Sequence, residues 1–237
     1  MPAGNSPVGV VMEYFKQAFD LILHDNSELR QIILTTLVMS FFSTVISSFI
    51  GIILGVILGR AEFRGKGIII RILNTLMSLP PVVAGLVVFM LFRSVGPFGS
   101  LHLMFSVTVM VIAQVLLITP VVCGLSAAAA EEKSAQLTET ALGIGVSRLK
   151  QTGLLIRECS GQFVSIVLLA FGRSIAEVGA VSMVGGNIQF KTRVMTTAIM
   201  LESNKGDFEK ALALGIILLL ISFAVNIIAY TLKEKIK

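Results

Sequence analysis

Five stretches of this 237-residue chain are long and apolar enough to cross a lipid bilayer. A membrane-spanning helix needs about 20 mainly apolar residues. A bilayer offers no hydrogen bonds to the backbone, so each stretch is expected to be helical. Four stretches carry almost no charge, and the one at 160–186 is interrupted only by Arg173 and Glu177. The stretches are 32–59, 72–92, 101–128, 160–186 and 211–232.

The composition predicts that lipid, rather than water, surrounds most of the chain. Hydrophobic residues make up 55% and charged residues 14%, whereas soluble domains average about 25% charged. We therefore expect an all-α integral membrane protein with one domain, 1–237, and a transmembrane core at 31–232. Residues 1–30 are expected to form an N-terminal segment in which 13–24 has apolar residues at helical spacing. That segment either lies at the membrane interface or packs on the spans as a short extramembrane helix.

The basic residues divide unevenly between the two faces that five spans create. Eleven of the 19 Lys and Arg residues fall on one face and seven on the other, and Arg173 lies within a span. The positive-inside rule places the richer face in the cytoplasm, so the N-terminus is expected outside and the C-terminus inside. The first group is Arg60, Arg64, Lys66, Arg71, Lys133, Arg148, Lys150, Arg157, Lys233, Lys235 and Lys237; the second is Lys16, Arg30, Arg93, Lys191, Arg193, Lys205 and Lys210.

The sequence lacks the residues that several classes of protein require. No GxxxxGK[ST] loop is present to cradle nucleotide phosphates. Cys123 and Cys159 form neither a disulfide framework nor a zinc motif, and the two histidines show no metal-ligand spacing. The net charge is +5, and the basic residues flank the spans, where they suit contact with anionic lipid headgroups better than binding of nucleic acid. We expect no catalytic residue and no metal or cofactor on this chain, and any ATP hydrolysis on a partner.

A polar island at 131–157 interrupts the apolar pattern on the predicted cytoplasmic face. Residues 136–150 are expected to form a helix, a bend and a second helix, with glycines at 143 and 145 where another backbone can approach. Glu139, Thr140, Ala141 and Gly145 resemble the EAAxxxG motif of permeases of ABC importers. Thr140 departs from the Ala that follows Glu in the motif, and the Leu-Pro that often follows is absent. The resemblance implies a coupling helix that inserts into a separate ATPase subunit.

Two features mark a path through the membrane. Pro80 and Pro81 interrupt the second predicted span, because proline lacks an N–H and disrupts a helix. They indicate either a kink beside a translocation path or a packing kink. Arg173 and Glu177, four residues apart on one predicted helix face, are expected to pair and to face protein or water. They either order the helices or place Arg173 near a path for anions.

The segment after the fourth stretch combines cations with hydroxyl groups. Lys191, Arg193, Thr196 and Thr197 suit a tetrahedral oxyanion, or belong to a hairpin that packs on the spans and receives a partner. The runs 171–180, 183–188 and 192–199 resemble molybdate and tungstate permeases, and 201–215 resembles the tungstate branch. The resemblance implies the fold of a type I ABC importer permease with about five spans. It also implies a homodimer in a prokaryotic plasma membrane, which binds two ATPase subunits and receives substrate from an external oxyanion-binding protein.

The expected function is that of the membrane subunit of an ATP-driven oxyanion importer, and the resemblance implies that the oxyanion is tungstate. A molybdate or sulfate importer is the alternative within the same class. A passive channel and an integral membrane enzyme are alternatives from other classes, but a channel needs no docking motif and an enzyme needs convergent catalytic groups.

Overall fold

The described part of the chain is helical throughout. The computed structural model describes residues 16, 27–144 and 148–236, so most of the predicted N-terminal interfacial segment lies outside the described residues. A short 3₁₀ turn, η1 (Gly99–Leu101), precedes the longest helix. The helices are α2 (Ser27–Arg60), α3 (Lys66–Met77), α4 (Pro81–Phe92), α5 (Val107–Ile144), α6 (Arg148–Glu158), α7 (Ser160–Ile175), α8 (Gly179–Gly185), α9 (Met195–Lys205) and α10 (Phe208–Ile236).

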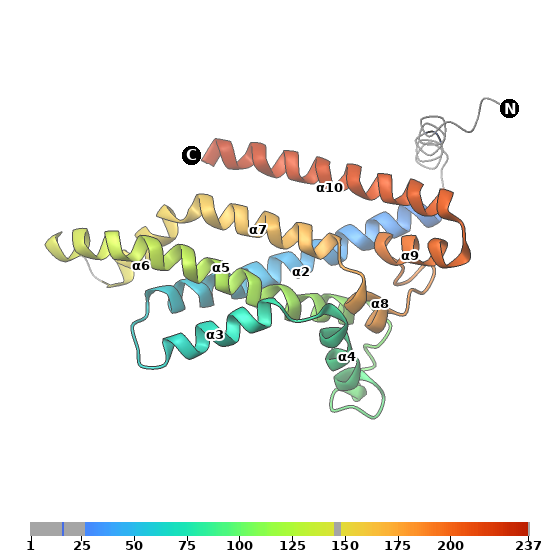
Figure 1. Ribbon diagram of the computed structural model, residues 1–237, viewed down its shortest axis with the longest axis horizontal. Helices are drawn as coiled ribbons and strands as arrows, with labels where there is room; N and C mark the ends of the chain where they lie inside the picture. The colour runs from blue at the N-terminus through green and yellow to red at the C-terminus, as the bar shows by residue number, and fades with distance from the viewer. Residues whose placement is uncertain (1–15, 17–26, 145–147, 237) are drawn as a thin grey trace.

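The spanning elements are three continuous helices and two bent pairs. By length and composition, α2, α5 and α10 each contain a span, and the pairs α3–α4 and α6–α7 bring the number to five if each pair counts as one. The long helices lie side by side along the long axis of the molecule (Figure 1). The expected all-α membrane fold is confirmed. Within the predicted span 72–92, α3 and α4 meet at 96°, at the prolines that were expected to interrupt the helix.

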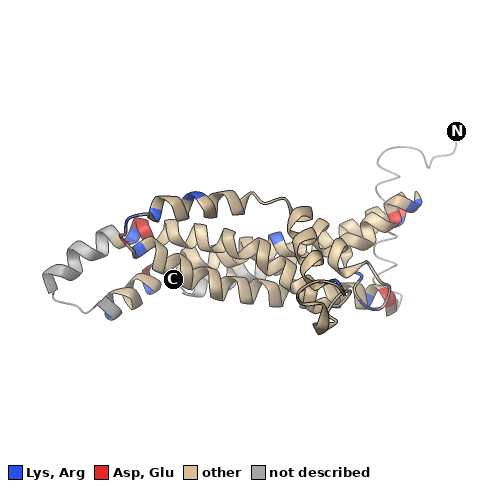
Figure 2. Cartoon of the chain, turned by 90° about the horizontal axis from the view of Figure 1, so that it is seen from below, with Lys and Arg blue, Asp and Glu red and all other residues tan. Residues whose placement is uncertain are grey.

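The charged connections gather at the ends of this bundle (Figure 2). The α2–α3 connection, the α5–α6 hairpin and the C-terminal end of α10 lie at one end, whereas α9 and the starts of α2 and α10 lie at the other (Figure 1). The structure therefore places together the three segments that the charge count assigned to one face. That this face is the cytoplasmic one stays a prediction.

Helices α2 and α5 pack with their backbones in contact. Glycine recurs every fourth residue on α2, at Gly51, Gly55 and Gly59. A Cβ at Gly55 would lie 2.6 Å from both the Cys123 carbonyl oxygen and the Ser126 Cβ, and one at Gly51 would lie 2.7 Å from the Val122 Cβ. Small residues permit this approach in lipid, where packing rather than water exclusion holds helices together. We call this contact the α2–α5 seam.

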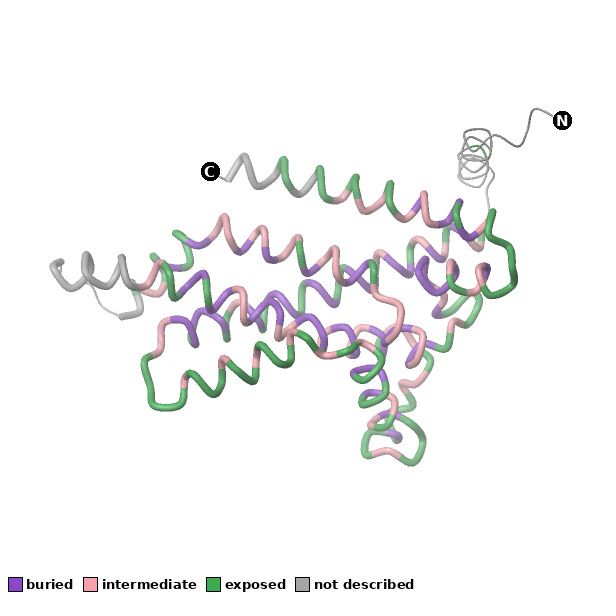
Figure 3. Tube along the Cα trace, viewed as in Figure 1, coloured by how far each residue is buried: buried purple, intermediate pink, exposed green. Residues whose placement is uncertain are grey.

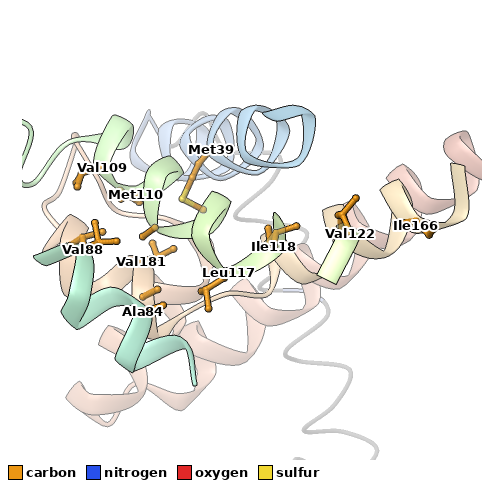
Figure 4. Packing of buried hydrophobic residues seen from close by; sticks show 14 of the residues in the cluster. Met39, Ala84, Val88, Val109, Met110, Leu117, Ile118, Val122, Ile166 and Val181 are labelled. Carbon is orange, nitrogen blue, oxygen red and sulfur yellow. The ribbon is translucent and has the colours of Figure 1, made fainter. Parts of the chain in front are cut away.

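A hydrophobic core continues from the α2–α5 seam to α4, α7 and α8. It includes Met39 of α2, Val88 of α4, Ile118 of α5, Ile166 of α7 and Val181 of α8 (Figure 4). The opposite surfaces of the long helices are exposed and apolar, notably on α3 and α10 (Figure 3). Large apolar side chains on the outside are the reverse of what a water-soluble protein shows, and they suit a protein whose outer surface meets lipid.

An ionic cluster joins α9 to the start of α10. Glu202 Oε1 accepts hydrogen bonds from Lys205 Nζ at 3.1 Å and Lys210 Nζ at 3.2 Å, and its side chain is 7% exposed. Burial alone would raise the pKa of Glu202, but the hydrogen bonds from the two lysines outweigh it and hold the pKa below its usual value. The ionised carboxylate therefore stabilises the folded state at neutral pH.

Substitution of Gly55 by Ala should destabilise the protein. Overpacking a tight contact costs about 1–3 kcal/mol, which exceeds the roughly 1 kcal/mol that Ala gains over Gly in a helix. Gly215→Ala in α10 is the matched control, because a Cβ there meets nothing within 4 Å. Thermal unfolding in detergent should give a lower midpoint for Gly55→Ala and an unchanged or higher one for Gly215→Ala. Equal midpoints for the two variants would contradict the packing described for the seam.

Substitution of Glu202 by Gln should lower stability at neutral pH and matter less in acid. A carboxylate with a depressed pKa contributes stability above its unfolded pKa, and this contribution is lost as pH falls through the folded pKa. The difference in unfolding midpoint between wild type and Glu202→Gln should therefore narrow below about pH 4. Glu62→Gln, at an exposed position of the α2–α3 connection, serves as the control. A difference that stays constant with pH would refute the role of the ionised form.

Candidate functional site

The predicted docking residues lie at the far end of α5. Glu139, Thr140 and Ala141 fall within the last two turns of this helix, which ends at Ile144; Gly145 lies outside the described residues. The last turns of α5 reach farther along the molecule than any other described helix (Figure 1). The helix expected from residue 136 is thus the continuation of the third span, and α6 follows it from Arg148. We call the C-terminal turns of α5 together with α6 the elbow.

The predicted proline interruption is confirmed, and it creates a sharp break rather than a gentle kink. Helix α3 ends at Met77, Pro80 is extended with φ −60° and ψ 130°, and Pro81 is the first residue of α4. Proline suits the first position of a helix, because the N–H there has no partner within the helix. The two prolines therefore end one helix and start another in a different direction.

A second break lies directly against the proline break. Helix α7 ends at Ile175 and α8 begins at Gly179. A Cβ at Gly85 of α4 would lie 2.8 Å from the Ala180 Cα of α8, and a Cβ at Gly179 would lie 3.0 Å from the Val82 side chain. The start of α4 and the start of α8 are therefore in contact, and two interrupted helices meet at one junction.

Glu177 belongs to this junction, but its expected pairing with Arg173 is wrong. Because α7 ends two residues before Glu177, the four-residue spacing does not put the two side chains on one helix face. Glu177 Oε1 instead accepts a hydrogen bond from the Ala180 N–H at 3.2 Å, and its carbonyl accepts one from Thr196 Oγ1 at 2.8 Å. Arg173 has a buried Nε without a partner among the described residues.

The sequence analysis missed a buried polar network beside Arg173. Gln114 of α5 accepts a hydrogen bond from Ser43 of α2 at 2.7 Å, and its Nε2 donates to the Ser174 carbonyl of α7 at 2.9 Å. The Ser174 hydroxyl contacts the Gln114 Oε1 as well. All three side chains are fully buried. Gln114 is the one amide in the stretch 101–128, and polar groups inside spans mark structural or functional contacts.

The residues predicted to meet an oxyanion mostly hold the loop between α8 and α9 in place. Thr197 Oγ1 accepts a hydrogen bond from the Val194 N–H at 3.1 Å and so caps α9. Arg193 forms an ion pair with Glu28 at 2.6 Å and donates to Asn187 at 3.3 Å. Lys191 differs from these residues, because it is exposed on the loop between α8 and α9.

The structure thus divides the predicted path residues into three groups. Thr196 is hydrogen-bonded to Glu177 just before α8, and α8 contacts α4 close to Pro80 and Pro81. Arg193 and Thr197 stabilise the loop between α8 and α9, and Lys191 lies exposed on it. The elbow lies at the opposite end of the bundle (Figure 1). This arrangement places a junction of broken helices at one end and a projecting polar element at the other, linked by α5. Whether these residues line a path stays a prediction.

Comparisons with known proteins agree with this arrangement. Residues 51–237 match the family described as binding-protein-dependent transport system inner membrane component. The chain is 36% identical to a tungstate uptake system permease protein, TupB, of Peptoclostridium acidaminophilum, over 95% of this chain and 99% of the relative. It is 38% identical to the protein of the same name from Campylobacter jejuni, over 94% of both chains.

A more distant relative is the sulfate transport system permease protein CysT of Salmonella typhimurium. It is 28% identical over 81% of this chain and 73% of its own length. The helical fold, the spans and the family match over most of the chain lead to one assignment. This chain belongs to the family of inner membrane components of binding-protein-dependent transport systems, which are permease subunits of ABC transporters.

Proposed function

We propose that this chain is the membrane subunit of an ATP-driven tungstate importer in a prokaryotic plasma membrane. The identity of 36–38% over nearly the whole chain to two tungstate uptake permeases carries the proposal. A sulfate or molybdate importer is the second candidate, and the similarity to a sulfate permease favours sulfate within it. Membership of a binding-protein-dependent family argues against a passive channel.

The driving reaction takes place on partner subunits in this proposal. The sequence has no phosphate-binding loop of its own, and the elbow projects beyond the other described helices (Figure 1). Two copies of a cytoplasmic ATPase bind the elbows through Glu139, Thr140, Ala141 and Gly145. ATP itself binds those subunits. Because a partner shifts a conformational equilibrium only when it binds the two states unequally, ATP binding must change how the ATPase holds the elbow.

A second copy of this chain completes the path. Helix α3 has no buried residue, and Ile68, Ile72 and Leu76 are exposed along it. The exposed apolar surface continues onto α4 at Val82, next to the junction of broken helices. In a homodimer this surface faces the partner, and the junction residues Pro80, Pro81, Glu177 and Thr196 line the route between the copies. Arg173, with its unpartnered Nε, supplies positive charge below them.

An external binding protein delivers the anion to the end of the bundle that carries the loop between α8 and α9. Lys191 is exposed there, and Arg193, Thr196 and Thr197 lie behind it. In this orientation the N-terminus is outside the cell and the C-terminus is cytoplasmic. Selection among oxyanions belongs largely to the binding protein, because tungstate and molybdate differ little in charge and size.

The proposal is tested by reconstituting the permease with its ATPase and binding protein in liposomes. Tungstate uptake should require ATP on the elbow side and the loaded binding protein, and calorimetric titration of the binding protein should show tighter binding of tungstate than of sulfate. Uptake of sulfate but not tungstate would favour the second candidate. Uptake without ATP would refute an ATP-driven importer.

Substitution of Gly145 by Asp should abolish binding of the ATPase without unfolding the permease. The new side chain places bulk and negative charge where the motif leaves room for a partner backbone. The variant should keep its unfolding midpoint but no longer co-elute with the ATPase. Gly67→Asp, at an exposed position of α3 outside the elbow where a Cβ meets nothing within 4 Å, should co-elute normally. Normal co-elution of Gly145→Asp would refute the docking assignment.

A further inference from the structure

Lys66 ties three helices together at the base of the elbow. It is the first residue of α3. Its Nζ lies 2.9 Å from Glu131 Oε1 of α5 and donates to the carbonyl of Gly59, near the end of α2, at 3.2 Å. The Lys66 side chain is 17% exposed, although the connection that leads to it is largely exposed. One ammonium group therefore fixes the start of α3 to α2 and α5.

Arg60 makes a parallel connection to the other arm of the elbow. It is the last residue of α2. Its Nη2 donates to Gln151 Oε1 of α6 at 2.9 Å, and its Nη1 donates to Thr152 Oγ1 of the same helix. The guanidinium group thus holds two adjacent side chains of α6. Such a fork restricts direction as well as distance.

These contacts exceed what membrane orientation requires. The positive-inside rule depends only on the number of cations near a span. Arg64, Arg71 and Lys150 meet that need as exposed side chains at the same end of the molecule. Arg60 and Lys66 instead turn toward α5 and α6. Their geometry indicates a mechanical role in addition to an orienting one.

Helix α3 is built to follow the elbow. It buries none of its own residues, and the helix that it packs along is α5, which continues into the elbow. At its start it is held by Lys66, and at its end the sulfur of Met77 packs against Gly124 of α5. Three residues later the chain reaches Pro80 and the 96° break into α4. A displacement of the elbow is therefore passed to the start of α3 and along it to the junction of broken helices.

We propose that Arg60 and Lys66 are positioning residues that transmit movement of the elbow to the Pro80–Pro81 break, with Lys66–Glu131 as the principal link. This inference rests on the proposed function, because it assumes that an ATPase moves the elbow. It assigns the transmission to two named contacts at the membrane surface. Glu131, the carboxylate partner of Lys66, is 56% exposed, and solvent screening makes such a pair contribute little to folding stability, so the pair can be broken without losing the fold.

The test uses the full complex of permease, ATPase and binding protein in liposomes, with Lys66→Glu and the reciprocal exchange Lys66→Glu/Glu131→Lys. Lys66→Glu should keep the ATPase bound but lower tungstate uptake per ATP hydrolysed by about tenfold, within the range usual for coupling between sites. The double exchange restores an ion pair of opposite polarity and should restore the coupling. Arg60→Ala should behave like Lys66→Glu, whereas Arg64→Ala on the same connection should behave like wild type.

A second readout does not depend on which anion is carried. Spin labels at Val87 of α4 and Phe49 of α2, both exposed, report the position of α4 against the seam. ATP should change their separation in wild type and in the double exchange but not in Lys66→Glu. An unchanged response in Lys66→Glu would overturn the inference while leaving the proposed function intact. A wild-type response without tungstate uptake would refute the substrate alone, and a wild-type separation that ignores ATP would overturn both proposals.

Discussion

The close contact between α2 and α5 is the constraint on which the rest of the structure depends. Glycines at 51, 55 and 59 bring the two backbones together, and the Ser43–Gln114–Ser174 network joins α7 to the same pair. In lipid, van der Waals contact and buried hydrogen bonds replace water exclusion as the forces that hold helices. The seam therefore provides a fixed frame, and the broken helices are arranged around it.

The frame is interrupted at two places, which are the parts that move in the proposed mechanism. The prolines at 80 and 81 divide one predicted span, and the end of α7 at Ile175 divides another. Both breaks meet where α4 touches α8, at the end of the bundle opposite the elbow. Helix α5 connects the two ends as one continuous helix that contains Pro120, and α3 packs along it as a second connection between the elbow and the proline break.

The sequence was sufficient to predict the all-α class, the family and the interruption by proline, because each depends on local composition or a short motif. The five predicted spans correspond to three long helices and two bent pairs. The Arg173–Glu177 pair was wrong because the end of α7 depends on contacts of Glu177 with Ala180 and Thr196. Gln114 was missed because its partners Ser43 and Ser174 lie 71 and 60 residues away. Spacing along one helix does not reveal such contacts between helices.

The proposed function requires that the end of the bundle with the elbow faces the cytoplasm. Single cysteines at Lys150 of α6 and Lys191 of the loop between α8 and α9, both exposed, can be labelled with a membrane-impermeant maleimide in right-side-out vesicles. The native Cys123 and Cys159 are buried, so they should give little background. The account predicts that the cysteine at 191 reacts in sealed vesicles and that the one at 150 reacts only after permeabilisation. The reverse pattern would contradict it, because the elbow would then lie beyond the reach of any cytoplasmic ATPase.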